Sequence, residues 1–256
     1  MKKISAIITC YNEAPNIERA LQSLSWCDEL IVVDSFSDDG TFEIAQKYTD
    51  KVWQRKYIHP ADQKNWAIPQ AAHPWIILLD ADEWVPADLQ AEIRSWLATP
   101  EIPYVAFWIY RNNHFMGKRI RYSGWQRDKV IRFFQRDLCR YPDQMVHEEI
   151  IASGPVGKLK NRLEHNTFRS LEHFRAKMDR YAAWSAVDKE PRTGRITAYH
   201  MLVKPAFRFF KHFILDLGWL DGYRGYLIAQ LNARAIRMRY IKMKAARNAN
   251  SGTHSL

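Results

Sequence analysis

The stretch Trp75-Ile76-Ile77-Leu78-Leu79-Asp80-Ala81-Asp82 joins an unbroken apolar run to two carboxylates that stand two residues apart. The apolar run predicts a buried strand, and the strand ends where the charges begin. Because the chain turns there, both carboxylates can reach one hard divalent cation, which prefers oxygen ligands. Two buried carboxylates repel each other and lose hydration, so a nearby cation makes the pair tolerable. The stretch therefore indicates a metal and diphosphate site, and a solvated turn before the next helix is the alternative.

Strand-like and helix-like patterns alternate through the first hundred residues, which predicts a largely parallel sheet covered on both faces. Ligands of such sheets bind beyond the carboxyl ends of the strands. Asp34 and Asp80 both follow predicted strands and therefore share that rim, although Asp34 alone is also consistent with a satisfied turn residue. The expected strands are 4–9, 29–33, 52–54 and 75–79, and the expected helices are 16–24, 41–48, 62–70 and one that opens at Pro86.

From residue 104 the pattern changes to short segments, which predict an antiparallel, partly polar addition. A helix over 170–189 and a helical tail that starts at Pro205 follow. Three cysteines without paired spacing argue against a disulfide framework and a zinc site, so the expected compartment is the reducing cytosol. The expected short segments are 104–110, 120–123, 130–134 and 159–165.

The net charge of +10 is concentrated near the C-terminus of the 256 residues. After Asp221 there is no Asp or Glu but there are seven Lys or Arg, whereas the rest of the chain has 31 basic and 28 acidic residues. Such a block attracts an anionic surface, either lipid headgroups or nucleic acid. The segment from Pro205 mixes Phe and Leu with Lys and Arg, so it is too charged to span a bilayer but can lie on one. A nucleic-acid-binding protein is the second hypothesis, which the lack of a reader motif disfavours.

Four motifs resemble, in order, the nucleotide-binding half of family 2 glycosyltransferases, which have the GT-A fold. They are Ile7-Ile8-Thr9-Cys10-Tyr11-Asn12-Glu13, Val32-Val33-Asp34-Ser35 with Asp39-Gly40-Thr41, Gln63-Lys64-Asn65, and Leu79-Asp80-Ala81-Asp82-Glu83. Later segments resemble a bacterial branch of that family, the small lipopolysaccharide core glycosyltransferases. Those segments are Ser123-Gly124-Trp125, Ile131-Arg132-Phe133-Phe134, Val146-His147-Glu148, Leu163-Glu164-His165 and Gly218-Trp219-Leu220-Asp221-Gly222.

The resemblance implies an α/β fold, a Rossmann-like mixed sheet of GT-A type flanked by helices, with a C-terminal basic amphipathic helical appendage. It implies a glycosyltransferase domain over 1–200, with a nucleotide-sugar half in 1–100 and an acceptor half in 101–200, and a membrane-surface tail over 201–256. The implied reaction is inverting, metal-dependent transfer of a hexose, with UDP-glucose as the expected donor, onto a lipopolysaccharide core heptose or a similar lipid-linked acceptor. The expected location is cytoplasmic, peripheral on the inner face of the cytoplasmic membrane through 205–247, without a nucleic acid partner.

The resemblance also assigns roles to single residues. The ring of Tyr11 would lie against the base, Asp34 would accept a hydrogen bond from uracil, and Lys64 would lie near the base and phosphate. Asp82, with Asp80 nearer the ribose or a bound water, would hold the Mg²⁺ or Mn²⁺ on the diphosphate. The full set that would line the nucleotide-sugar pocket is Thr9, Tyr11, Glu13, Asp34, Lys64 and Asp80.

An inverting transfer needs a base that removes the proton of the acceptor hydroxyl. Glu148 is the expected base, with Glu149 and Asp143 as competing choices and an exposed acidic turn as the alternative.

On the acceptor side, Trp125 would stack on a sugar and Arg132 would pair with a phosphate, whereas a buried Trp and a surface Arg are the commoner fates. His147 and His165 are further acceptor-side candidates, with a core role as the alternative. A third hypothesis is a non-catalytic membrane scaffold on a nucleotide-binding fold.

Overall fold

The structure, a computed structural model, describes residues 1–142, 149–168 and 170–252 of the chain. The chain divides into two compact units. Unit 1 comprises Met1–Asn112 and Arg127–Asn166, and unit 2 comprises Asn113–Gln126 and Thr167–Leu256. These units are defined by compactness. The division by function that the sequence predicts, with boundaries at residues 100 and 200, stays a prediction.

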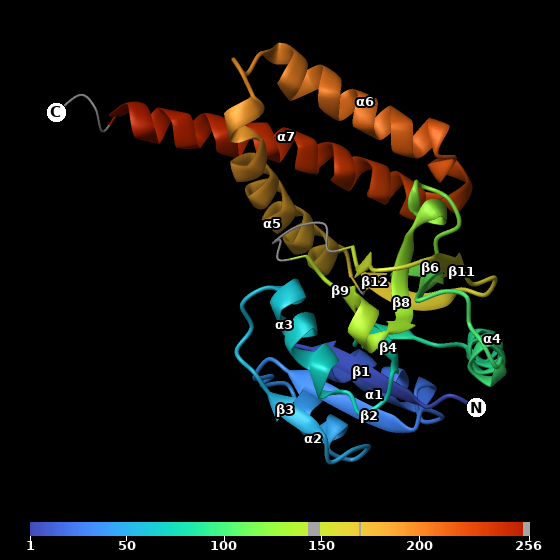
Figure 1. Ribbon diagram of the computed structural model, residues 1–256. Coiled ribbons are helices and arrows are strands. Elements are labelled where there is room, and N and C mark those ends of the chain that lie inside the picture. Colours follow the sequence, from blue (N-terminus) through green and yellow to red (C-terminus); the bar gives the residue numbers. More distant parts are fainter. Residues whose placement is uncertain (143–148, 169, 253–256) are drawn as a thin grey trace. The chain divides into compact units, whose positions relative to one another are not determined.

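Ten strands of the described residues form one mixed sheet, in the order β3-β2-β1-β4-β8-β6-β12-β5, and β7 and β11 pair with β6 (Figure 1). β1 lies between β2 and β4 and is parallel to both, whereas β4 and β8 are antiparallel. The predicted mixed α/β sheet flanked by helices is therefore confirmed. The strands are β1 Ile4–Cys10, β2 Glu29–Asp34, β3 Val52–Gln54, β4 Trp75–Asp80, β5 Glu83–Trp84, β6 Ala106–Phe115, β7 Lys118–Arg119, β8 Lys129–Gln135, β11 Val156–Lys158 and β12 Leu163–Phe168, with a separate pair of β9 Cys139–Arg140 and β10 Ile151–Ala152.

Helices bury both faces of the parallel strands in unit 1. Ile8 and Ile77 belong to one apolar cluster with residues of α1 and α4, while Ile7 and Ile76 belong to the opposite cluster with residues of α3. Because successive side chains of a strand point to opposite faces, burial on both faces requires the unbroken apolar runs seen in the sequence. The helices of unit 1 are α1 Ala14–Ser23, α2 Thr41–Ala45, α3 Pro60–Ala67 and α4 Ala87–Ala98, with 3₁₀ turns at Ile68–Gln70 and Arg136–Leu138.

Unit 2 is mainly helical and has an apolar core of its own. Phe115, Phe168 and Phe174 pack with apolar residues of α7, and the rings of Phe168 and Phe174 stack with centroids 3.9 Å apart. The C-terminal helical appendage predicted from the sequence is thus present, but the helical part of unit 2 begins earlier in the chain, with α5. These are α5 Leu171–Lys189, α6 Lys204–Phe210 with π-helical turns before it at Tyr199–Val203 and after it at Lys211–Leu215, and α7 Tyr223–Gly252, with 3₁₀ turns at Trp125–Arg127, Glu190–Arg192 and Gly218–Asp221.

The predicted strand over 120–123 is wrong, and one carboxylate explains why. Asp221 accepts hydrogen bonds from the backbone N–H groups of Arg121 at 2.9 Å and Tyr122 at 3.0 Å, and from the hydroxyl of Ser123 at 2.8 Å. Backbone donors that bond to a side chain are lost to a sheet ladder. Ser123 also has a φ of 62°, which is left-handed rather than extended. The segment is therefore a loop held against the 218–221 turn.

We expect Gly225→Ala to destabilise unit 2. A Cβ at Gly225 would lie 1.8 Å from the carbonyl oxygen of Gly218, so α7 and the 218–221 turn would have to separate. Alanine favours a helix by about 1 kcal/mol over glycine, and a backbone overlap of this kind costs about 1–3 kcal/mol or more. Urea unfolding should show a lower midpoint for Gly225→Ala. Gly194→Ala is the control because its Cβ meets nothing within 4 Å, and equal midpoints for the two variants would contradict this account.

Candidate active site

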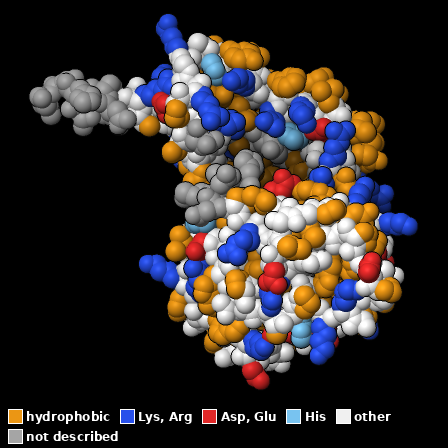
Figure 2. All heavy atoms as spheres, in the orientation of Figure 1, with side chains coloured by type: hydrophobic (Ala, Val, Ile, Leu, Met, Phe, Trp, Pro, Cys, Tyr) orange, Lys and Arg blue, Asp and Glu red, His pale blue; other side chains and the backbone are white. Residues whose placement is uncertain are grey.

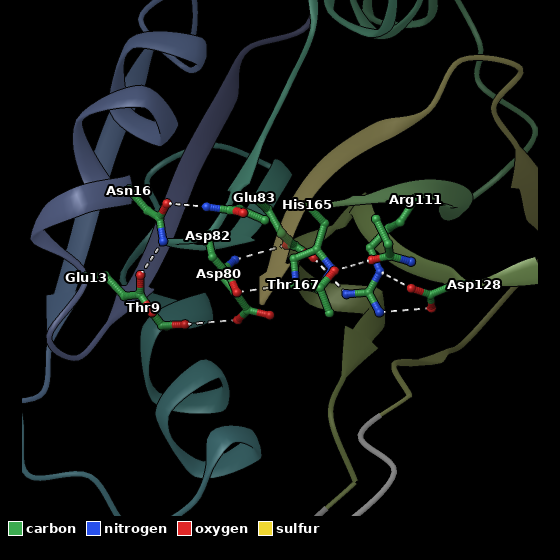
Figure 3. Close-up of polar contacts among 12 residues, drawn as sticks. Thr9, Glu13, Asn16, Asp80, Asp82, Glu83, Arg111, Asp128, His165 and Thr167 are labelled. Carbon is green, nitrogen blue, oxygen red and sulfur yellow. Dashed lines mark hydrogen bonds and ion pairs between the residues drawn. The ribbon is translucent and has the colours of Figure 1, made fainter. Parts of the chain in front are cut away.

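The polar site lies where β4 ends in unit 1, beside the end of β1. Thr9 is the register partner of Asp80, and its hydroxyl lies 3.4 Å from Asp80 Oδ1. Figure 3 shows Asp80, Asp82, Glu83 and His165 gathered at these strand ends. The predicted carboxylate rim is therefore formed by the parallel strands, as expected for ligand sites of such sheets.

Two cations of the protein itself neutralise Asp80. Lys64 Nζ lies 3.1 Å from Asp80 Oδ1, and Arg132 Nη2 forms an ion pair with the other carboxylate oxygen. Partial burial by itself raises the pKa of Asp80, but Arg132 and Lys64 outweigh it, so the pKa lies well below its usual range. Asp80 is therefore ionised without a metal. Lys64 and Arg132 thus supply positive charge that makes this carboxylate tolerable, and binding of a metal near Asp80 stays a prediction.

Glu83 is fully buried and is the residue that sequence reasoning missed. Its carboxylate lies 3.0 Å from Arg111 Nη1 and 2.8 Å from Arg132 Nε, and it accepts the N–H of Asp80 at 3.1 Å. Arg111 in turn holds Asp128 through two hydrogen bonds of 2.9 Å. The sequence signal was present, since Glu83 ends the quoted carboxylate motif, but a turn glutamate is normally solvated.

Asp82, two residues after Asp80, lies against His165. Nε2 of His165 is 3.3 Å from Asp82 Oδ2, and both side chains are largely buried. The strand pairing of β5 with β12 brings them together, because His165 is the register partner of Glu83 and the N–H of Asn166 donates to the Asp82 carbonyl at 2.8 Å. His165, predicted on the acceptor side, is thus a neighbour of the predicted metal ligand.

Asp82 and His165 fit a divalent cation only as a partial ligand set. A carboxylate oxygen and an imidazole nitrogen are both donors that Mn²⁺ accepts. Among the residues that the structure describes, no group of three His, Cys, Asp or Glu side chains is arranged to hold a metal. A cation at Asp82 would therefore need ligands from the substrate or from water.

The other nucleotide-side residues surround the end of β1. Tyr11 is 59% exposed, so its ring is open to a base. Glu13 accepts a 2.6 Å hydrogen bond from the side-chain amide of Asn16. The side-chain oxygen of Asn16 accepts a 2.9 Å hydrogen bond from the side-chain amide of Asn166. These contacts connect α1 to the strand that carries His165, and Figure 3 shows Thr9 and Glu13 on this side of the site.

Asp34 is buried and engaged by its own turn. It accepts the N–H of Ser37 at 2.9 Å, the Ser37 hydroxyl, and a longer 3.4 Å bond from Gln54. Phe36 in this turn is exposed and has a φ of 59°, a conformation that a bulky residue seldom adopts. These local hydrogen bonds agree with the alternative interpretation of Asp34 as a turn residue whose hydrogen bonds are satisfied within the turn. The contact of Asp34 with uracil stays a prediction.

The residues predicted on the acceptor side are spread over different parts of the chain. Arg132, predicted to be an acceptor contact, is buried between Asp80 and Glu83. Trp125 belongs to unit 2 and packs in its aromatic cluster, 5.9 Å from Phe168 between ring centroids. Glu148, His147 and the competing Asp143 lie outside the described residues, whereas Glu149 is described and exposed. The choice among these bases therefore stays a prediction.

A family model described as "Glycosyl transferase family 2" matches residues 5–152. A lipopolysaccharide core biosynthesis glycosyltransferase, LpsC of Rhizobium meliloti, is 28% identical over 245 residues, which are 90% of this chain and 87% of the relative. An uncharacterized glycosyltransferase of Rickettsia bellii is 27% identical over 259 residues, or 95% of this chain and 86% of the relative. The sequence resemblance stated above is therefore confirmed.

Among solved structures, a mannosyltransferase, PcManGT from Pyrobaculum calidifontis in complex with GDP-Man and Mn²⁺, has a similar fold. The TM-score is 0.55 at 18% identity, and the match covers 94% of this chain and 87% of that chain. At this identity the likeness speaks for the fold alone.

We expect Arg132→Met to lower the free energy of unfolding far more than removal of a surface arginine does. The variant leaves Glu83 and Asp80 with one cation fewer in a buried site, and breaking a buried pair in this way costs about 3–5 kcal/mol. Arg234→Met is the matched control, because Arg234 and Asp179 form an exposed ion pair of 3.2 Å, and such pairs contribute about 0–1 kcal/mol. The free energy of urea unfolding measures both. A loss for Arg132→Met no larger than that of the control would show that the buried charges find other partners.

Proposed function

The chain belongs to glycosyl transferase family 2, and we propose that it is an inverting, metal-dependent hexosyltransferase acting on a lipid-linked saccharide. The proposed donor is UDP-glucose, and the proposed acceptor is a heptose of the lipopolysaccharide core or a similar lipid-linked sugar. The observation that carries the proposal is the pairing of Asp82 with His165 beside the Asp80–Lys64 ion pair at the end of β4. The lipopolysaccharide core relative supports the acceptor class.

Asp82 and His165 would hold the metal, and Asp80 would have a separate task. The carboxylate oxygen of Asp82 and the imidazole nitrogen of His165 face one another, and the diphosphate of the donor would supply further oxygens. The mannosyltransferase PcManGT, which has a similar fold, is described in complex with both GDP-Man and Mn²⁺. When bound, a divalent cation stabilises the negative charge that grows on the departing nucleotide. Asp80, already neutralised by Lys64 and Arg132, is better placed to orient the ribose or a water than to be a main metal ligand.

The nucleotide would lie over the carboxyl ends of β1 and β2. The exposed ring of Tyr11 offers an apolar face to the base, and Thr9, Glu13 and Asp34 line the same strand ends. Lys64, on α3, adds positive charge toward the phosphates while it holds Asp80. These side chains bind and orient the donor so that its anomeric carbon is presented to the acceptor.

Proton removal from the acceptor hydroxyl is assigned to Glu148. Inversion at the anomeric carbon needs attack from the side opposite the nucleotide, so the base would lie across the sugar from the metal-bound diphosphate. We also propose that the enzyme works at the inner face of the cytoplasmic membrane, because the proposed acceptor is anchored in lipid. Trp125 and His147 remain proposed acceptor contacts.

We expect Asp82→Ala to abolish most Mn²⁺-dependent release of UDP from UDP-glucose. Loss of a ligand to the ion that stabilises the leaving group removes several kcal/mol of transition-state stabilisation, and about 3 kcal/mol corresponds to roughly 100-fold in rate. Asp137→Ala is the control, because Asp137 is an exposed carboxylate paired with its neighbour Arg136. Equal turnover in Asp82→Ala and the control would refute the metal assignment.

We expect Glu148→Gln to bind UDP-glucose normally but to transfer the sugar about 10²–10⁴-fold more slowly, the range for a lost general base. Calorimetric titration with the donor and a transfer assay with a heptose acceptor separate the two quantities. Glu149→Gln tests the neighbouring carboxylate. If Glu148→Gln turns over normally while Glu149→Gln does not, the base is Glu149. If the wild type binds the donor in a 1:1 ratio and transfers to no acceptor, the scaffold hypothesis replaces the enzyme.

A further inference from the structure

Unit 2 contains an amphipathic helical segment whose two sides differ sharply. The segment runs through Tyr199–Val203, α6 and Lys211–Leu215 and lies along α7 (Figure 1). Pro205 and His212 of the segment are buried, His212 Nδ1 lies 3.1 Å from the carbonyl oxygen of Ser123, and Lys204 donates a 3.0 Å hydrogen bond to the hydroxyl of Tyr240 on α7. One side of the segment is therefore fixed to the rest of the unit.

The other side of this segment presents large apolar side chains to solvent. They recur every three or four residues, which places them on one side of a helix. Two of them, Phe207 and Phe210, are 60% and 47% exposed. Figure 2 shows hydrophobic side chains over this part of the molecule with Lys and Arg among them. The exposed residues are Tyr199, Leu202, Val203, Phe207, Phe210 and Ile214.

The apolar surface continues into the turn between α6 and α7. Leu217, Trp219, Leu220 and Tyr223 are all exposed there, with Trp219 at 52%. The turn is not loose, because the Asp221 carboxylate is held by backbone and hydroxyl donors of residues 121–123 and Leu217 takes a left-handed φ of 57°. Aromatic side chains fixed outward by a rigid turn are suited to insertion into another phase.

Cations flank this turn on the β6–β7 hairpin. Lys118, Arg119 and Arg121 are exposed, and the N–H of Arg121 donates to Asp221. Arg224, which opens α7, donates 3.0 Å hydrogen bonds to the carbonyl oxygens of Phe115 and Met116 and so ties the hairpin to the helix. The basic hairpin and the apolar turn therefore form one surface within unit 2.

The two units also differ in total charge. Unit 2 has 20 Lys and Arg against 6 Asp and Glu, whereas unit 1 has 18 against 22. The net positive charge of the protein thus resides in unit 2, because unit 1 has more acidic than basic residues. An exposed patch that is both apolar and strongly basic is typical of proteins that lie on an anionic bilayer.

We propose that the exposed side of residues 199–223 together with the β6–β7 hairpin docks on an anionic lipid surface; we call this surface the lipid face. The rings of Phe207, Phe210 and Trp219 enter the boundary between headgroups and acyl chains, and Lys118 and Arg119 meet lipid phosphates. None of the helices in the described part of the chain has the length and apolarity to cross a membrane. A nucleic acid would leave the apolar side chains in water, so it fits the surface less well.

The lipid face differs from the segment 205–247 predicted from the sequence. Most of α7 belongs to the predicted segment, but most of its aliphatic residues, among them Leu227, Leu231 and Met243, are buried in unit 2, whereas Ile241 is 38% exposed. The lipid face instead includes the β6–β7 hairpin, which lies nearly a hundred residues earlier in the chain. The proposal adds a partner to the proposed function but does not need the chain to be a transferase, so the two can fail separately.

Co-sedimentation with vesicles tests the lipid face. We expect the wild type to sediment with vesicles of phosphatidylcholine and phosphatidylglycerol and to remain largely in solution with phosphatidylcholine alone, because the attraction is partly electrostatic. Phe207→Ser with Phe210→Ser should lower the bound fraction at least about tenfold, since two rings lose their transfer into lipid. Lys118→Glu with Arg119→Glu should weaken binding to the anionic vesicles only.

The matched control is Leu138→Ser with Ile151→Ser, which removes apolar side chains that are 37% and 60% exposed in unit 1. This control should bind vesicles like the wild type, and circular dichroism should show all variants folded. Quenching of Trp219 fluorescence by bromolipids, lost in Trp219→Ser, should place the turn in the bilayer. Unchanged binding of the Phe207/Phe210 variant, or binding of the wild type to DNA but not to anionic vesicles, would overturn the proposal. UDP release measured without vesicles on the same proteins reports separately on the transferase.

Discussion

The charge of Glu83 constrains the centre of unit 1, because this carboxylate has no exposed surface and must be compensated inside the protein. Arg132 and Arg111 supply that compensation, and each of them is held a second time, by Asp80 and Asp128. With Lys64 on Asp80, three carboxylates meet three cations. A balanced, hydrogen-bonded network of this kind resists rearrangement, since removal of any member leaves its partners with one opposite charge fewer.

The network also decides what the neighbouring groups are free to do. Asp80 is turned toward Lys64 and Arg132, whereas Asp82 is directed to His165. β5 is only two residues long, yet its pairing with β12 fixes this arrangement, because the register sets His165 opposite Glu83. A rigid set of charges around a diphosphate suits a reaction in which negative charge grows on the leaving group, since preorganised groups need no reorganisation when the charge develops.

The two units divide the electrostatic character of the molecule. Unit 1 carries a small excess of acidic residues and buries its ion pairs, while unit 2 carries the whole positive excess and presents it beside exposed aromatic side chains. This division suits the proposed function, in which the donor would be a soluble anion and the acceptor would be anchored in lipid. The exposed apolar side of residues 199–223 is costly in water unless something covers it, which gives the surface a physical reason to bind.

By itself, the sequence determined the alternation of strands and helices, the rim of carboxylates after β4 and the amphipathic character of the tail. These features rest on local periodicity and on turn chemistry, which neighbouring residues fix. Only the tertiary structure decided that Glu83 is buried, that Arg132 and Lys64 neutralise Asp80, and that His165 stands against Asp82. It also decided that 120–123 is a loop and that α7 buries most of the apolar side that the sequence offered to a membrane surface. Each of these depends on partners far apart in the chain, and no periodicity within one segment records which distant side chain will satisfy a charge or cover a helix.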